Sequence, residues 1–109
     1  MGRSLAMQSI GRIRKPSGSS GPIEAAIAAT LLELCTRRAL RHPGGTVCPS
    51  EVARALWPEG GGWRAHMDAV RVVGRALALE GAIEITQRGR VLDPGAPGRG
   101  PIRYRLPLR

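Results

Sequence analysis

Apolar residues recur at helical spacing over the segment that follows Pro22. No glycine or proline interrupts this segment before Arg41, and its apolar residues fall at intervals of three and four. These residues are Ile23, Ile27, Leu31 and Leu34. Pro22 suits the first turn of a helix, and the arginines gathered near Arg41 suit the negative end of its dipole. The pattern predicts a helix over residues 22–41, ended by the HPGG sequence at 42–45.

A short second helix is predicted within CPSEVARALWP, residues 48–58. Pro49 fits the first helical position, and Pro58 ends the helix. The apolar face consists of Val52, Ala53 and Leu56. Because this helix is barely two turns long, tertiary packing must hold it. The EGGG run at residues 59–62 predicts a turn.

A third helix is predicted over residues 63–80, with Gly81 after its last turn. Its core stripe consists of Trp63, Met67, Val70 and Leu77. A second stripe, about 100° away, has three arginines around one acid, namely Arg64, Asp68, Arg71 and Arg75. Gly74 lies in the apolar stripe, where it costs about 1 kcal/mol relative to Ala. We expect a close approach of another helix at Gly74.

After Gly81 the apolar residues alternate with polar ones, as in a half-buried strand. The alternation covers residues 83–86 and 102–106, which predicts two strands of a hairpin with Glu84 opposite Arg103 or Arg105. A tight turn at Arg88-Gly89 would start a local hairpin through Val91 and Leu92. Thr46 and Val47 are too short for more than a bridging strand.

Helix, short strand, short helix, long helix and hairpin follow in the order of an α+β winged helix-turn-helix, with three helices and a C-terminal β-hairpin wing. The segments PSEVARALWP, WRAHMDAVRVVG, ALEGAIEITQRGRVLDP and GPIRYRL resemble a small bacterial domain-of-unknown-function family predicted to be winged-helix. The resemblance covers about residues 23–108. It implies the fold but no activity.

Composition divides the chain into a tail and one domain. Residues 1–21 contain four basic residues and no acid, and KPSGSSGP at 15–22 is typical of a flexible linker. We therefore predict a disordered basic tail over residues 1–21 and the winged-helix domain over residues 22–109. A mitochondrial transit peptide is the less favoured interpretation of the same tail.

Charge points to a polyanionic partner. The 109 residues contain 17 Lys and Arg against 8 Asp and Glu, a net charge of +9. The chain has no Phe, one Tyr and two Trp, too few aromatics for a base-stacking sheet. No apolar run is long enough to span a membrane. Two cysteines fit a reducing compartment, so we expect a cytoplasmic protein with no membrane partner.

The sequence favours nucleic acid, DNA more than RNA, as the partner. In a winged helix the third helix enters the major groove, and the wing reaches the minor groove or the phosphates. The predicted binding residues are Arg64, Arg71 and Arg75 on the third helix and Arg88, Arg90 and Arg99 in the hairpin loop. The exposed helix face lacks Asn, Gln, Ser and Thr, so non-specific or shape-based binding is expected.

Each of these residues also has a structural interpretation. The arginine stripe could be a solvated face linked by Arg64–Asp68 and Asp68–Arg71 pairs. Loop arginines such as Arg99 could serve only solubility. The two tryptophans are expected to pack around the helix junction rather than contact a ligand. Arg54 could contact a phosphate or nothing.

Catalysis is not expected, and no cofactor is implied. The candidate metal ligands or nucleophiles are Cys35, His42, Cys48 and His66, whose spacings match no zinc motif. Cys48 precedes Pro49 at a helix N-terminus, where the dipole could activate its thiol, although an N-cap role is favoured. The alternative to nucleic-acid binding is a protein-interaction or scaffold module, with a partner protein or a second copy of the chain.

Overall fold

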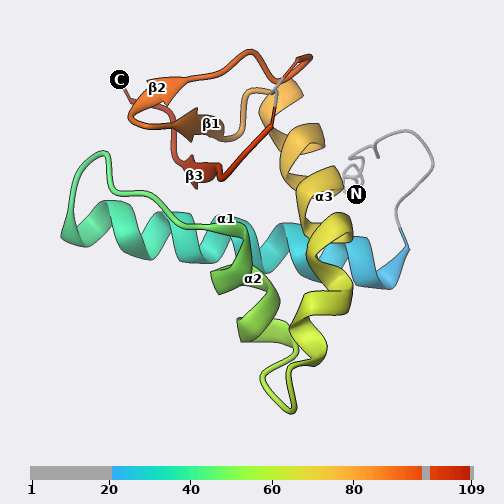
Figure 1. The fold of residues 1–109 in the computed structure, drawn as a ribbon. Coiled ribbons are helices and arrows are strands. Elements are labelled where there is room, and N and C mark those ends of the chain that lie inside the picture. Colours follow the sequence, from blue (N-terminus) through green and yellow to red (C-terminus); the bar gives the residue numbers. More distant parts are fainter. Residues whose placement is uncertain (1–20, 97–98, 109) are drawn as a thin grey trace, which may run out of the picture.

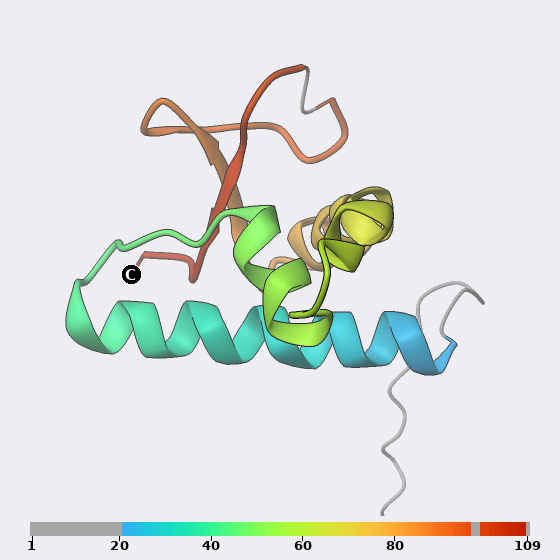
Figure 2. The ribbon, with the colours of Figure 1, turned by 60° about the horizontal axis from the view of Figure 1, so that its bottom comes forward.

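The computed structural model describes residues 21–96 and 99–108. The predicted tail lies outside these residues except for Gly21, the N-cap of the first helix. The fold is α+β, with three α-helices on one side and a small antiparallel sheet on the other (Figure 1). Helix α1 (Pro22–Arg41) runs along one side of the molecule, and α2 (Pro49–Leu56) and α3 (Met67–Leu79) pack against it (Figure 2).

The predicted bounds of the first two helices are confirmed. In α1, Ile27, Leu31 and Cys35 follow one another at four-residue intervals and are fully buried. In α2, Cys48 is the N-cap and Pro49 the first residue, while Val52 and Ala53 face the core.

The third predicted helix begins differently from the expectation. Residues Gly62–His66 form a 3-10 helix, η2, and α3 starts only at Met67. The φ angles of Gly60 and Gly61 are +62° and +75°, so the chain enters the helix from a left-handed turn. The Arg64 amide then bonds the Gly61 carbonyl at 3.2 Å, three residues back, as in the tighter helix.

The C-terminal end of α3 has the predicted glycine stop. Gly81 has a φ of +83°, and its amide bonds the Ala78 carbonyl at 3.0 Å. The Ala82 amide bonds the Leu77 carbonyl at 2.9 Å. This pair of bonds is the Schellman motif, which turns the chain towards the sheet.

The sheet has the strand order β2-β1-β3, in which β1 is Glu84–Gln87, β2 is Arg90–Val91 and β3 is Arg103–Arg105. Both predicted pairings are present. β1 pairs with β3, where Glu84 faces Arg105, and with β2 across the Arg88-Gly89 turn. Val47 joins as the predicted bridge, because its amide and carbonyl both bond Tyr104, each at 2.7 Å.

Tyr104 is the centre of the core. Its side chain is fully buried, and it is the largest residue to be so. The expectation that another helix approaches Gly74 is wrong, because the neighbour is the Tyr104 ring. A Cβ at Gly74 would lie 2.6 Å from the Cζ and Oη atoms of Tyr104. The absence of a side chain at Gly74 therefore lets α3 lie against the sheet.

Candidate nucleic-acid interface

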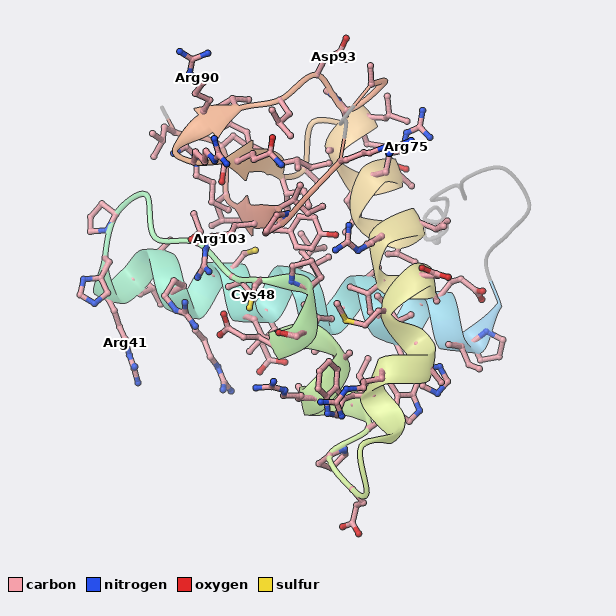
Figure 3. The ribbon with its side chains drawn as sticks, in the orientation of Figure 1. Arg41, Cys48, Arg75, Arg90, Asp93 and Arg103 are labelled. Atoms are coloured by element: carbon pink, nitrogen blue, oxygen red, sulfur yellow. The ribbon has the colours of Figure 1, made fainter. Side chains whose placement is uncertain are left out.

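The six predicted binding arginines are all exposed and lie on two parts of the fold, the η2–α3 segment and the β1–β2 hairpin region. Arg64 lies in η2, at the N-terminal end of α3, and Arg71 and Arg75 lie on α3 itself. Arg88, Arg90 and Arg99 lie in and around the β1–β2 hairpin (Figure 3, where Arg75 and Arg90 are labelled). The structure thus distributes them over α3 and the hairpin rather than gathering them in one cluster.

Arg75 has a structural partner that the sequence did not reveal. Its Nε donates to the Pro94 carbonyl at 2.9 Å, and its Nη2 donates to the Gly95 carbonyl at 3.0 Å. The same loop is shaped by Asp93, whose Oδ1 accepts from the Gly95 amide at 2.8 Å. Arg75 therefore fastens the loop after β2 to α3, and only part of its guanidinium is left for a ligand.

Arg71 stays on the exposed face of α3, close to the buried Tyr104. Burial raises the pKa of Tyr104 to about 12, and the positive charge of Arg71 acts in the opposite direction. The Tyr104 hydroxyl has no hydrogen-bond partner within the described part of the chain. No hydrogen bond or ion pair within that part engages the Arg71 guanidinium either, which leaves it available to a ligand.

The β1–β2 hairpin presents its arginines at the tip. Arg88 and Gly89 have φ angles of +53° and +82°, the conformation of a two-residue type I′ hairpin loop. Gln87, at the end of β1, holds the returning chain through its Nε2, which donates to the Arg99 carbonyl at 2.6 Å. The side chains of Arg88, Arg90 and Arg99 are exposed around this turn.

The tryptophans lie at the junction of α2 and η2 and are half-buried, as expected for packing residues. The Trp57 and His66 rings are stacked, with centroids 3.6 Å apart. The guanidinium groups of Arg54 and Arg64 make cation–π contacts with the Trp63 ring, each with Cζ 4.5 Å from the ring centroid. Sequence patterns do not reveal this second role for Trp63, because Arg54 and Trp63 belong to different helices.

The ion pairs within residues 21–96 and 99–108 involve none of the six predicted binding arginines. They join Arg37 to Glu33 at 2.7 Å, Arg105 to Glu84 at 2.9 Å, and Glu51 to Arg38 and Arg103 at 2.5 and 3.9 Å. The Arg64–Asp68 and Asp68–Arg71 pairs, which a purely solvated face would favour, are not among them. Three acids, Glu33, Glu51 and Glu84, are therefore paired with arginines outside the predicted binding set. A fourth acid, Glu24, caps α1 by accepting from the Gly21 amide at 3.0 Å.

The exposed face of α3 is nevertheless mixed. Asp68 is exposed beside the arginines, and Val72 and Leu79 are 64% and 60% exposed. Apolar side chains in such positions can contact a thymine methyl group or a protein partner. The composition of this face is therefore relevant to both functional hypotheses.

Glu51 organises the start of α2. Burial acts to raise the pKa of its carboxyl, but hydrogen bonds from the Cys48 amide, the Arg38 guanidinium and the Cys48 thiol outweigh burial. The pKa of Glu51 therefore lies below its ordinary value. This carboxylate ties α1 to the N-terminus of α2.

The cysteines and histidines do not assemble into a metal centre in the described ranges, where no three potential ligands come together. Burial raises the pKa of the Cys35 thiol to about 11, with Arg38 acting against it, so this thiol stays protonated near neutral pH. Cys48 is half-buried, with its Sγ 3.2 Å from Ser50 Oγ.

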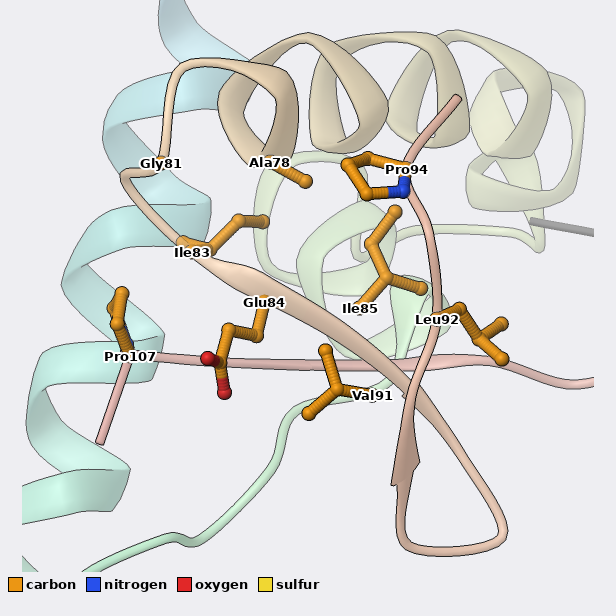
Figure 4. A pocket seen from close by; sticks show the side chains of 9 residues that line it. All are labelled: Ala78, Gly81, Ile83, Glu84, Ile85, Val91, Leu92, Pro94 and Pro107. Atoms are coloured by element: carbon orange, nitrogen blue, oxygen red, sulfur yellow. The ribbon is translucent and has the colours of Figure 1, made fainter. Parts of the chain in front are cut away.

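A pocket of about 220 Å³ lies between the C-terminal end of α3 and the β1–β2 hairpin (Figure 4). Its lining is apolar except for Glu84, whose carboxylate accepts from Arg105 Nε. Such a lining offers van der Waals contact rather than acid–base chemistry. The helices of the described residues include none that is long and apolar enough to cross a membrane.

A family model described as "Protein of unknown function (DUF3253)" matches residues 24–107. The match spans α1 to the end of β3 and so includes every predicted binding arginine. No curated protein matches the chain.

Proposed function

The chain belongs to the DUF3253 family of proteins of unknown function, and on this premise we propose that it is a non-catalytic, cytoplasmic winged helix-turn-helix module that binds nucleic acid, chiefly duplex DNA. Helix α3 is the recognition helix, and the β1–β2 hairpin with the loop that follows it is the wing. Binding proceeds mainly through contacts of arginine with phosphates and groove edges.

One observation carries this proposal. Within residues 21–96 and 99–108, the arginines in ion pairs are Arg37, Arg38, Arg103 and Arg105. None of them is among the six predicted binding arginines. The six predicted binding arginines form no ion pair within these residues, although the chain has eight acids. Unpaired cations along one helix and an adjoining hairpin match the charge of a nucleic-acid backbone.

The Arg75 contact gives the surface a fixed shape. Because its guanidinium bonds the carbonyls of Pro94 and Gly95, the wing is held at a defined position relative to the recognition helix. A rigid helix–wing unit favours reading the width and curvature of a groove. This supports shape-based rather than base-by-base recognition.

The test is a salt-titrated binding assay with random-sequence duplex DNA. If about four to six phosphates are neutralised, the logarithm of the association constant should fall against the logarithm of salt concentration with a slope of about −4 to −5. Single-stranded RNA of equal length should bind more weakly. A flat salt dependence, or no binding to duplex DNA at low salt, would overturn the proposal.

A second candidate is a protein-interaction module, and the exposed Val72 and Leu79 on α3 favour it. They are seven residues apart and therefore project from the same side of the helix. Sedimentation equilibrium of the wild type and of Val72→Ser/Leu79→Ser tests a second copy as the partner. Self-association that the double variant abolishes, with DNA binding absent, would favour this candidate.

A further inference from the structure

Two guanidinium groups share one indole ring at the turn between α2 and η2. The Cζ atoms of Arg54, from α2, and Arg64, from η2, each lie 4.5 Å from the centroid of the Trp63 ring. The two positive charges can therefore be no farther apart than twice that distance. Like charges at this separation repel each other, and an anion bound by both groups would offset the repulsion.

No carboxylate provides that anion in the described part of the chain. The acids nearest in sequence are Glu51, three residues before Arg54, Glu59, five residues from each arginine, and Asp68, four residues after Arg64. Glu51 is engaged by Arg38 and by the Cys48 amide. Neither Glu59 nor Asp68 forms an ion pair within residues 21–96 and 99–108. The charge of the two arginines is thus left for an external ligand.

The turn also fixes the position of Arg64. Gly61 has a φ of +75°, and a Cβ at this position would lie 3.4 Å from the Arg64 Nη1. The guanidinium therefore lies against the turn backbone as well as near the Trp63 ring. Side chains held in this way lose little conformational freedom when they bind, and a guanidinium fork matches phosphate oxygens.

We propose that Arg54, Trp63 and Arg64 form a phosphate clamp, in which both guanidinium groups bind the phosphate of a nucleic-acid backbone. The proposal deepens the proposed function and rests on it for the source of the phosphate. The clamp lies at the N-terminal end of α3, and the wing adjoins its C-terminal end (Figure 1). The 13 residues of α3 span about 20 Å, more than the roughly 12 Å width of a major groove. Clamp and wing can therefore hold the two backbones on opposite sides of the groove.

The first experiment compares Arg54→Ala/Arg64→Ala with Arg37→Ala/Arg41→Ala, which removes the same charge from α1. At about 0.1 M salt, the clamp variant should bind duplex DNA about tenfold more weakly than the wild type, and its salt slope should be shallower by about one. The control should change both quantities less. Equal effects of the two variants, with DNA binding retained by the wild type, would overturn the clamp while leaving the proposed function intact. Thermal unfolding curves establish that both variants are folded.

The second experiment identifies the source of the phosphate. Trp57→Phe leaves Trp63 as the single tryptophan, so its fluorescence reports on the clamp directly. At constant ionic strength, a short duplex should change this fluorescence at lower phosphate concentration than inorganic phosphate does, and adding Arg54→Ala/Arg64→Ala should abolish the response. A response to inorganic phosphate alone would support the clamp and contradict the proposed function. No response to either probe would overturn the clamp.

A third variant tests the role of the indole ring. Trp63→Phe keeps both charges and an aromatic ring but weakens the cation–π contact, which is strongest for tryptophan. Affinity for duplex DNA should fall about two- to fivefold while the salt slope stays unchanged. A wild-type affinity in a folded Trp63→Phe protein would show that the ring does not position the arginines.

Discussion

Gly74 of α3 lies against the ring of Tyr104 of β3, so closely that a Cβ at position 74 would come within 2.6 Å of Cζ and Oη. Helix and sheet meet at this contact. Tyr104 also bonds Val47 through its backbone, so one strand residue links the connection after α1, the sheet and α3. The position of α3 relative to the sheet therefore depends on a glycine that helix propensity alone would disfavour.

Gly74→Ala should destabilise the protein despite the better helix propensity of alanine. Overpacking against the buried ring costs about 1–3 kcal/mol, against a gain of about 1 kcal/mol in propensity. Urea unfolding measures the difference. In a Tyr104→Leu background, which removes the ring, the same substitution should become neutral or stabilising. The contact would be refuted by equal effects of Gly74→Ala in the two backgrounds.

Tyr104 should ionise only in strong alkali and with loss of stability. Burial raises its pKa to about 12 from an ordinary value of 10. The neutral form is thus favoured in the folded protein, so the stabilisation is complete below about pH 10 and disappears as the pH rises towards 12. Because the chain has one tyrosine, absorbance at alkaline pH follows this group alone.

Tyr104→Phe is the matched variant for the hydroxyl. The Tyr104 hydroxyl is buried without a hydrogen-bond partner in the described residues, so its removal should be neutral or stabilising at pH 7. Urea midpoints at neutral and alkaline pH test both statements. A clear loss of stability at pH 7 would mean that the hydroxyl has a partner after all.

Arg75→Ala should release the loop after β2. Loss of the two bonds to Pro94 and Gly95 should increase hydrogen exchange at the Gly95 amide, while global stability changes by about 1 kcal/mol or less. Arg71→Ala, on the same helix, should leave that amide unchanged. Duplex affinity should fall in both variants, but only Arg75→Ala should alter the exchange of the loop. Unchanged exchange at Gly95 would contradict the anchoring role.

Asp68→Asn should strengthen DNA binding. Asp68 is exposed on α3 without an ion pair in the described ranges, so its charge opposes an approaching phosphate backbone. Glu80→Gln removes the same charge from the end of this helix, about 120° around it, and should have a smaller effect. The comparison at several salt concentrations checks the orientation of α3. Equal gains would show that only net charge matters.

Acid should destabilise the protein partly through Glu51. Its pKa in the folded state lies below the ordinary value of 4.5, so the stabilisation from its ionised form is present above about pH 4.5 and is lost as the pH falls further. The wild type should therefore lose more stability than Glu51→Gln between pH 6 and pH 3. Parallel urea midpoints over that range would rule out this contribution.

The helices and strands could be predicted from the sequence, because the features that start, stop and orient them involve residues close together in the chain. The apolar spacing in α1, the proline and glycine stops and the alternation around Ile83 depend on residues within one or two turns. The strand pairing restricted the partner of Glu84 to Arg103 or Arg105, and the structure has Arg105 opposite Glu84. The order of these elements determines the α+β arrangement.

Contacts between distant parts of the chain could not be predicted in the same way. The loop partner of Arg75 lies 19 residues away, and the partner of Gly74 proved to be a strand tyrosine rather than a helix. The stacking of Arg54 on Trp63 likewise joins two elements across a glycine turn. No periodicity encodes such pairs, because they follow from how the finished elements pack.

Arg103 and Thr46, which are joined by a side-chain hydrogen bond, stand 57 positions apart in the chain. Together with the neighbouring Val47–Tyr104 bridge, this contact encloses α2, η2, α3, β1 and β2 in one long loop. Closing such a loop is entropically unfavourable until the helices within it have packed, so the bridge should form late in folding. During synthesis from the N-terminus, the bridge of Val47 cannot form until Tyr104 has been added to the chain. A nascent chain that stops after β2 therefore has its helices but lacks the residue against which α3 packs.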